Sequence, residues 1–176
     1  MGEGLETATA WVALGSNIGH RGRALAALRG LLGRDGVRLA AASEELLTRP
    51  VGITAQGPFH NQVVRLEAAT PLAPLEWLRR CQGAETAAGR RAGIRWGPRR
   101  ADADILLLGP DGSVRVDLAE LRVPHPSLGD RPFLCALLEE LQPGLRHPDG
   151  WALRDRAGRY LRLAGPPGPG MAAARR

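Results

Sequence analysis

Hydrophobic and polar positions along the chain predict six main elements in the order strand, helix, strand, strand, helix, strand. Short apolar or alternating runs indicate the strands, and leucines at helical spacing indicate the helices. The predicted strands cover residues 8–14, 37–48, 59–69 and 102–108, and the predicted helices cover residues 21–34 and 71–88. The second strand is expected to bend around residues 43–45, where three polar residues follow one another.

This order of elements is that of a ferredoxin-like α+β sandwich, an antiparallel sheet with helices packed on one face. On the second helix, Leu75, Leu78 and Cys81 are predicted to face the core. Further elements follow towards the C-terminus. A third helix is expected with Asp130 as its cap and Pro132 in its first turn, and a last helix over residues 151–163.

Composition is consistent with one domain over residues 1–163, followed by a disordered tail over residues 164–176 that is rich in Gly, Pro and Ala. The chain has 176 residues, 44% of them hydrophobic, and can build a core without disulfides. No apolar run approaches the roughly 20 residues that span a bilayer, and no secretory signal is recognised. Cys81 and Cys135 lie far apart, which argues against a zinc ribbon. We therefore expect a cytoplasmic protein without a membrane partner.

The chain contains no lysine, so all 24 of its basic side chains are arginines. This excludes Schiff-base chemistry, pyridoxal-phosphate attachment and the lysine of a phosphate-binding loop. A GC-rich genome that replaces lysine by arginine accounts for this composition. Any phosphate binding must nevertheless use forked, permanently charged guanidinium groups. The net charge of +6 favours anionic ligands such as nucleotides or nucleic acids.

Asp102 and Asp104 are the clearest candidates for chemistry. Residues two apart on a strand point to the same face, so these carboxylates would stand side by side. A divalent cation beside them would relieve their repulsion, and Mg²⁺ prefers oxygen ligands. The alternative is a solvated start to an otherwise apolar strand.

An arginine-rich segment lies just before this pair and contains no lysine-based phosphate loop. Arginines that directly precede a carboxylate pair are typical of a site that binds a metal-bound polyphosphate. The carboxylates hold the metal, and the guanidinium groups neutralise the phosphates. A solvated basic surface or a nucleic-acid patch is the alternative. Taken together with the aspartates, the segment favours nucleotide phosphate transfer. The arginines are Arg90, Arg91, Arg95, Arg99 and Arg100.

Three weaker signals remain open from the residues alone. Phe59 and Phe133, the only phenylalanines, are either core residues or two sides of a slot for an aromatic ring, whose edge Asn61 could read. Gln82 and Glu85 lie one turn apart on the second helix and could touch one ligand or simply face solvent. His125, between two prolines, is either a phosphate contact or a structural loop residue.

Six sequence blocks, in order over about residues 11–148, together resemble the family of 6-hydroxymethyl-7,8-dihydropterin pyrophosphokinases, enzymes of folate synthesis. The RWGPR-x-x-D-x-D pattern is the most specific of them. The blocks are LGSN at 14–17, TRPVG at 48–52, FHN at 59–61, ETAAGR at 85–90, RWGPRRADAD at 95–104, and VPHP at 123–126 followed by Arg131 and Phe133.

The resemblance implies a ferredoxin-like fold and transfer of diphosphate from ATP to a pterin alcohol, with release of AMP. It implies two Mg²⁺ ions held by Asp102 and Asp104, and we expect Arg90 and Arg99 to stabilise the moving charge. The implied pterin-binding residues are Thr48, Pro50, Val51, Phe59, Asn61 and Phe133. The implied ATP-binding residues are Gln82, Glu85, Arg90, Arg95, Trp96, Arg99, Ile105, His125 and Arg131.

A monomer acting on small molecules, without nucleic acid as a partner, is therefore expected. The rival hypothesis is a non-catalytic basic ferredoxin-like module that binds a nucleotide or RNA. The paired aspartates argue against RNA, because they would repel phosphate unless metal ions intervened.

Overall fold

The computed structural model describes residues 5–48, 57–90 and 100–164. The strands are β1 (Thr7–Ser16), β2 (Val37–Ala42), β3 (Leu46–Thr48), β4 (Phe59–Leu72), β5 (Asp102–Leu108), β6 (Val116–Asp117) and β7 (Arg122–Val123). The helices are α1 (Arg21–Leu32), α2 (Pro74–Ala87), the 3-10 turn η1 (Leu128–Asp130), α3 (Pro132–Leu141) and α4 (Leu153–Ala164). The bend predicted at residues 43–45 is confirmed, since it separates β2 from β3.

The main sheet has the strand order β2-β4-β1-β5, and β3 pairs with β4 beside β2. All of these pairings are antiparallel. β1 is central and therefore buried on both faces, which explains its nearly continuous apolar sequence. Its side chains alternate: Val12 and Leu14 point into one core cluster, and Trp11 points into the other.

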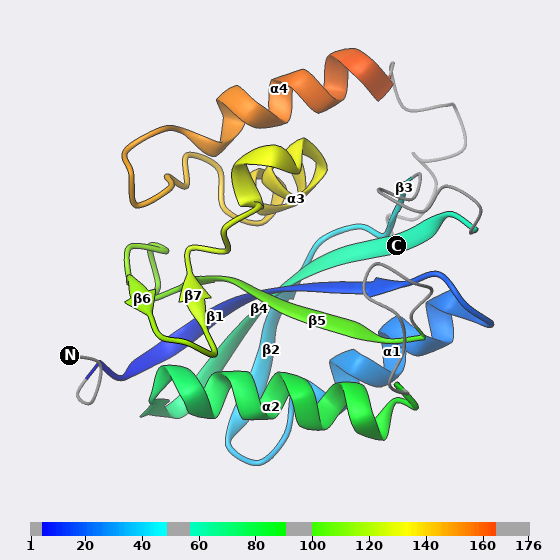
Figure 1. Cartoon of the computed structure of the whole chain (residues 1–176), viewed down its shortest axis with the longest axis vertical. Helices are drawn as coiled ribbons and strands as arrows, with labels where there is room; N and C mark the ends of the chain where they lie inside the picture. The colour runs from blue at the N-terminus through cyan, green and yellow to red at the C-terminus, as the bar shows by residue number, and fades with distance from the viewer. Residues whose placement is uncertain (1–4, 49–56, 91–99, 165–176) are drawn as a thin grey trace.

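Helices cover both faces of the sheet. Figure 1 shows α1 and α2 below the sheet and α3 and α4 above it. The βαββαβ unit places α1 and α2 on one face, as predicted, and the C-terminal additions bury the other face through apolar residues of α3 and α4. Without these additions, Trp11 and Leu106 would be exposed to water. The antiparallel α+β sandwich expected from the sequence is confirmed.

The core-facing side of α2 is centred on Trp77, which is fully buried and donates its indole N–H to the Thr7 carbonyl at 3.1 Å. Cys81 is buried as predicted. Leu75 and Leu78 are only partly buried and pack at the margin of the same cluster. The buried stripe of α2 therefore runs through Trp77, Cys81 and Ala84 to Glu85 at its C-terminal end.

We expect both cysteines to be unreactive in the folded protein. Burial raises the pKa of the Cys81 thiol to about 12 and that of the Cys135 thiol to about 11. The reactive thiolate is therefore scarce at pH 8, and the sulfur atoms are shielded from reagent. Titration with an aromatic disulfide reagent should detect no fast-reacting thiol in native protein and two after denaturation. Rapid labelling of native protein would contradict this burial.

The helix α3 begins one residue later than the sequence predicts. Asp130 is not its cap, because Leu128–Asp130 forms the 3-10 turn η1 and Arg131 is the N-cap. The prediction was wrong because a residue directly before proline avoids the helical region of backbone space, so Arg131 cannot join the helix that Pro132 starts. Arg131 is thereby held at the N-terminal end of α3.

The C-terminal helix extends beyond the predicted domain limit by one residue. Ala164, the first residue assigned to a tail, is the last residue of α4, and residues 165–176 lie outside the described residues. In the described part of the chain, no helix is long and apolar enough to cross a membrane. The single-domain organisation stays a prediction.

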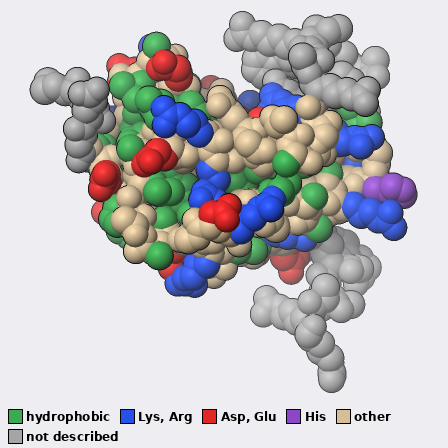
Figure 2. Space-filling view, turned by 90° about the horizontal axis from the view of Figure 1, so that it is seen from below, with side chains coloured by type: hydrophobic (Ala, Val, Ile, Leu, Met, Phe, Trp, Pro, Cys, Tyr) green, Lys and Arg blue, Asp and Glu red, His purple; other side chains and the backbone are tan. Residues whose placement is uncertain are grey.

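A hollow of about 530 Å³ lies on the side of the molecule formed by α1 and α2. Figure 2 shows this side, on which arginine and carboxylate side chains are interspersed. The hollow contains none of the site residues predicted from the sequence. Its lining consists of Leu31, Arg34, Asp35, Leu72, Glu76, Arg79, Arg80, Gly83, Ala84 and Ala87.

Candidate active site

The two aspartates lie at the start of β5, an edge strand that pairs with β1. Alternation along β5 sends Ala103 and Ile105 into the core beneath α1 and α2. Asp102 and Asp104 therefore project from the opposite face, the one that α3 covers further along the strand. The sequence-based prediction that they share one face agrees with this alternation.

Gly15 lies between the two sides of the candidate site. In the sheet register it is opposite Asn61 of β4 on one side and Asp102 of β5 on the other. A Cβ atom at Gly15 would lie 3.7 Å from Asn61 Oδ1 and 3.8 Å from Asp102 Cβ. A Cβ atom here would therefore make ordinary van der Waals contact with both residues, and a larger side chain would fill the gap between Asn61 and Asp102.

The other side of the site is formed by β3 and β4. Asn61 Nδ2 donates a hydrogen bond to Thr48 Oγ1 at 2.7 Å and contacts the Phe59 carbonyl at 3.4 Å. Phe59 and Asn61 share the β4 face of Val63, which packs against α3. Phe133, in the first turn of α3, is half-buried against the same core cluster. The four described pterin candidates thus border the same side of the sheet.

The end of α2 is attached to the start of β5 through Glu85. This buried carboxylate accepts the Ala103 N–H at 2.8 Å, and that amide lies between the two aspartates. Arg90 Nη1 donates to Glu85 and also to Asp102 Oδ1 at 2.8 Å. Burial raises the pKa of Glu85 to about 7, against the opposing effects of the Ala103 amide and Arg90. Arg90 is therefore held beside the carboxylate pair.

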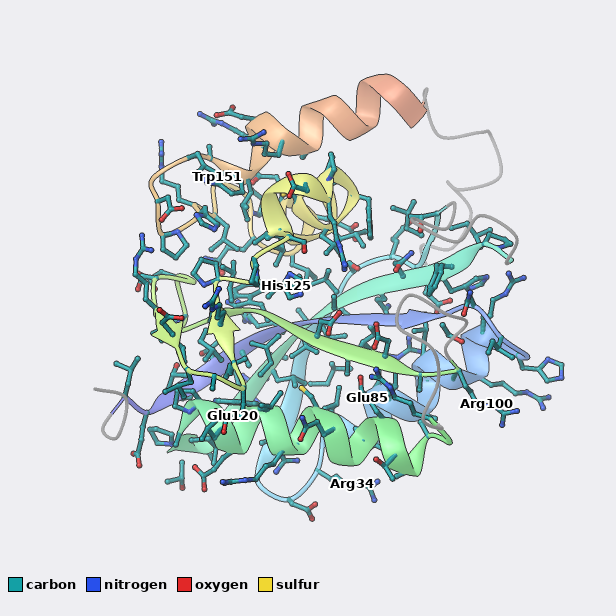
Figure 3. All side chains as sticks on the ribbon, in the orientation of Figure 1. Arg34, Glu85, Arg100, Glu120, His125 and Trp151 are labelled. Atoms are coloured by element: carbon teal, nitrogen blue, oxygen red, sulfur yellow. The ribbon has the colours of Figure 1, made fainter. Side chains whose placement is uncertain are left out.

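His125 lies on the other side of β5 from Glu85, as Figure 3 shows. Its backbone N–H donates to the Leu106 carbonyl at 2.9 Å, and its Nδ1 accepts the Ser127 N–H at 3.1 Å. Burial lowers the pKa of His125, nearby Arg131 lowers it further, and Asp102 opposes both. A neutral imidazole with Nδ1 already engaged can offer only its Nε2–H to a ligand.

Two predicted ATP contacts lie less centrally. Gln82 is exposed one turn before Glu85 on α2. The Ile105 side chain is buried in the core cluster under α1 and α2, so a ligand at the Asp102 face could meet only the backbone of this residue. Five predicted site residues lie outside the described residues: Pro50, Val51, Arg95, Trp96 and Arg99.

Sequence reasoning missed the position of Gly15 between two candidate site residues, Asn61 and Asp102. In the sequence this glycine was noted only as part of the LGSN block at residues 14–17, without a role of its own. Its meaning depends on the register of three strands, which pairing across the sheet decides. A glycine at the end of an otherwise continuous apolar strand is the signal that could have indicated it.

The arrangement defines a class of protein. A ferredoxin-like sheet whose edge carries two carboxylates, with an arginine held against one of them, is typical of an enzyme that acts on metal-bound phosphates. A non-catalytic basic module has no need of two adjacent carboxylates at its most basic segment.

Comparison with known proteins gives the family. Residues 11–143 match the family described as 7,8-dihydro-6-hydroxymethylpterin-pyrophosphokinase. The 2-amino-4-hydroxy-6-hydroxymethyldihydropteridine pyrophosphokinase of Pseudomonas aeruginosa is 41% identical over 141 residues, 80% of this chain and 84% of that protein. The Bacillus subtilis enzyme of the same name is 39% identical over 75% of this chain and 77% of that protein. The chain therefore belongs to the 7,8-dihydro-6-hydroxymethylpterin-pyrophosphokinase family, and the prediction of an enzyme is confirmed.

A solved structure extends the likeness to the fold. The HPPK-DHPS of Plasmodium falciparum with pteroate matches 90% of this chain with a TM-score of 0.67 at 13% identity. The match covers 43% of that protein, so this chain spans less than half of its length. The ferredoxin-like fold predicted from the sequence is thereby confirmed.

Proposed function

We propose that this protein transfers the terminal diphosphate of ATP to the hydroxymethyl group of 6-hydroxymethyl-7,8-dihydropterin and releases AMP, as a step of folate synthesis. Family membership supports the enzyme class. The observation that carries the proposal is the row Asn61, Gly15, Asp102 across three adjacent strands. In this row a group able to read a heterocycle edge and a group able to hold a metal are separated only by a glycine, at which a Cβ atom would contact both.

The carboxylate pair suits Mg²⁺. Among the described residues no cluster of three or more His, Cys, Asp or Glu side chains could hold a metal alone. Two carboxylates completed by substrate phosphates are a usual magnesium arrangement, whereas an all-protein cage is typical of other metals. We propose two ions at Asp102 and Asp104, which would neutralise the charge of the triphosphate and make its phosphorus atoms more electrophilic.

The protein's own residues then orient the reactants. The pterin hydroxymethyl oxygen attacks the β-phosphorus in line and releases its proton to water. The bond between that phosphorus and the α,β-bridging oxygen breaks, and its electron pair departs with AMP. Arg90, which contacts Asp102, would stabilise the negative charge that develops on the leaving α-phosphate, and Arg99 is proposed to assist it. Because phosphoryl transfer proceeds through a loose transition state, positioning and charge stabilisation matter more than a strong base.

The remaining proposed contacts divide between the two substrates. Thr48, Asn61, Phe59 and Phe133 would hold the pterin ring by hydrogen bonding and stacking. His125, on the other side of β5 from Glu85, and Arg131, which is near enough to lower the pKa of His125, would meet ATP phosphates. The other proposed contacts are Pro50 and Val51 for the pterin and Gln82, Glu85, Arg95, Trp96 and Ile105 for ATP.

The decisive experiment is an AMP-release assay with ATP and the dihydropterin alcohol. Dihydropterin-dependent AMP is expected, and its absence would overturn the proposal. ATP affinity should also fall when EDTA removes Mg²⁺. Affinity that is indifferent to EDTA, without turnover, would favour the non-catalytic binding module instead.

Phe133→Ala and Asn61→Ala should each weaken dihydropterin binding by about 1–3 kcal/mol and leave ATP affinity nearly unchanged. The first removes one face of the stacking slot, and the second leaves polar atoms of the pterin edge unpaired. Titration calorimetry with each ligand separately measures both affinities. Equal losses for pterin and ATP would instead assign Phe133 to the support of α3.

We further propose a monomer in the cytoplasm. The two cysteines are buried and unpaired, as is usual in a reducing compartment. Sedimentation at several protein concentrations tests the oligomeric state, and a concentration-dependent increase in mass would contradict a monomer.

A further inference from the structure

The short connection between β2 and β3, residues Ser43–Glu45, is held by polar contacts from both faces of the sheet. We call this segment the β2–β3 corner. β3 follows it directly, pairs with β4 (Figure 1), and places Thr48 beside Asn61. The direction in which the chain leaves the corner therefore determines where Thr48 lies.

From the α1 side, Arg29 binds the corner with its guanidinium group. Arg29 Nη1 donates to Gln62 Oε1 at 2.5 Å and to Glu45 Oε1 at 3.2 Å. Buried Gln62 links Arg29 to the first residue of the corner, since its Nε2 donates to the Ser43 carbonyl at 2.6 Å. The other oxygen of Glu45 lies 3.4 Å from Nδ1 of His60. Arg29 thus joins α1 to both the corner and β4.

From the α3 side, the corner is tied to the helix that carries Phe133. The Glu44 N–H donates to Glu140 Oε1 at 2.9 Å. Ser43 exchanges two hydrogen bonds with the Val63 backbone, through its own N–H and through its hydroxyl oxygen. Leu46, the first residue of β3, packs against the same core cluster as α3. The corner therefore connects β3 and β4, on one side of the proposed pterin pocket, with the helix on the other.

We propose that the β2–β3 corner fixes the geometry of the pterin pocket, with Arg29 as the positioning residue that holds it. This inference rests on the proposed function. It adds to the proposed pterin pocket a residue of α1, on the opposite face of the sheet. Arg29 contacts Glu45 and Gln62, the sequence neighbours of Leu46 and Asn61, and acts on the pterin through them.

A lysine at this position can replace the contact only in part. Glu45 and Gln62 both accept from one nitrogen, Arg29 Nη1. A lysine ammonium also carries enough N–H donors for two acceptors, but it ends a shorter side chain and lacks the fixed plane of the guanidinium group. The Arg29 and Glu45 side chains are 26% and 34% exposed, so their ion pair contributes little to folding stability. A small displacement of a binding group nevertheless weakens binding strongly. Loss of the bond to buried Gln62 also costs some stability. The expected effect is therefore larger on pterin affinity than on folding.

The test compares Arg29→Gln and Arg29→Lys with a matched control, Arg23→Gln, an exposed arginine on the same helix. Arg29→Gln should raise the dihydropterin Kd about tenfold, and Arg29→Lys should raise it less. The ATP Kd and kcat at saturating pterin should change less than twofold. The control should match the wild type in all three quantities, and all melting temperatures should remain close to that of the wild type.

A second variant tests whether the effect passes through the corner. Glu45→Ala removes this acceptor and should weaken pterin binding, and its combination with Arg29→Gln should add little beyond the larger single effect, because both break one network. Additive losses would overturn the proposed route through Glu45.

Three outcomes overturn the inference. The first is an unchanged dihydropterin Kd in Arg29→Gln, and the second is a parallel loss of pterin and ATP affinity with a lower melting temperature. If the first outcome occurs while the wild-type protein turns over substrate, the proposed function stands and only the positioning role of Arg29 is refuted. The third outcome is a wild type that binds no dihydropterin, which defeats both.

Discussion

Asp102→Ala and Asp104→Ala should each reduce dihydropterin-dependent AMP release by about a thousandfold or more, which corresponds to about 4 kcal/mol of transition-state stabilisation. Each variant removes a ligand of the ions that would place the phosphates. ATP affinity should fall less, because arginines still attract the phosphates. Single-turnover assays at saturating substrates measure the loss of rate.

The same variants should fold normally. In the ligand-free protein the two carboxylates repel one another, so removal of one offsets the loss of the Arg90–Asp102 contact. Arg90 keeps its contact with Glu85. Combining the two variants should cost little more than either alone, since both disable one metal centre. Asp117→Ala, an exposed strand residue, is the control. Near-normal AMP release by either variant would refute the metal assignment, and unfolding of both would show that the carboxylates are structural.

Trp77→Ala should destabilise the fold by about 3–5 kcal/mol, a large part of the roughly 5–15 kcal/mol of a typical domain. The substitution empties the volume of a fully buried indole between α2 and the sheet. It also leaves the Thr7 carbonyl without the N–H that it accepts at 3.1 Å. Urea denaturation followed by circular dichroism measures the free energy of unfolding.

Trp151→Ala provides the comparison for this loss. Trp151 is half-buried and stacks on the His147 ring at 4.3 Å, outside the sheet. Its removal should cost less than half as much as the removal of Trp77. Similar losses for both variants would mean that α2 does not depend on its central tryptophan.

Local sequence signals predicted most of the helices and strands. They also predicted that Asp102 and Asp104 of the candidate site share one face of a strand. Periodicity located the strands and helices because each was long enough to bury one face, and the alternation along residues 102–108 already placed Asp102 and Asp104 together. On α2, however, the emphasis on Leu75 and Leu78 overlooked Trp77. The difference is a small rotation of the helix, which packing against the sheet decides and spacing alone does not.

The features of the candidate site that sequence could not provide depend on contacts between distant segments. The gap at Gly15 arises from pairing with two other strands. The contacts of Arg29 with Glu45 and Gln62 join residues 16 and 33 positions apart. The start of α3 was misjudged for a local reason, because the aspartate cap signal was given more weight than the constraint that Pro132 places on Arg131.

The position of Gly15 gives β1 the role of a spacer. Neighbouring strands lie about 4.8 Å apart, so the backbones of Asn61 and Asp102 are separated by about 10 Å, the width of two strand intervals. Hydrogen bonds of the central sheet set this span, and insertions or deletions in the surface connections do not alter it. Such changes could alter how fast the substrates enter and leave. The separation between the proposed pterin site and the proposed metal site, and with it the choice of phosphorus that the pterin oxygen would reach, would stay the same.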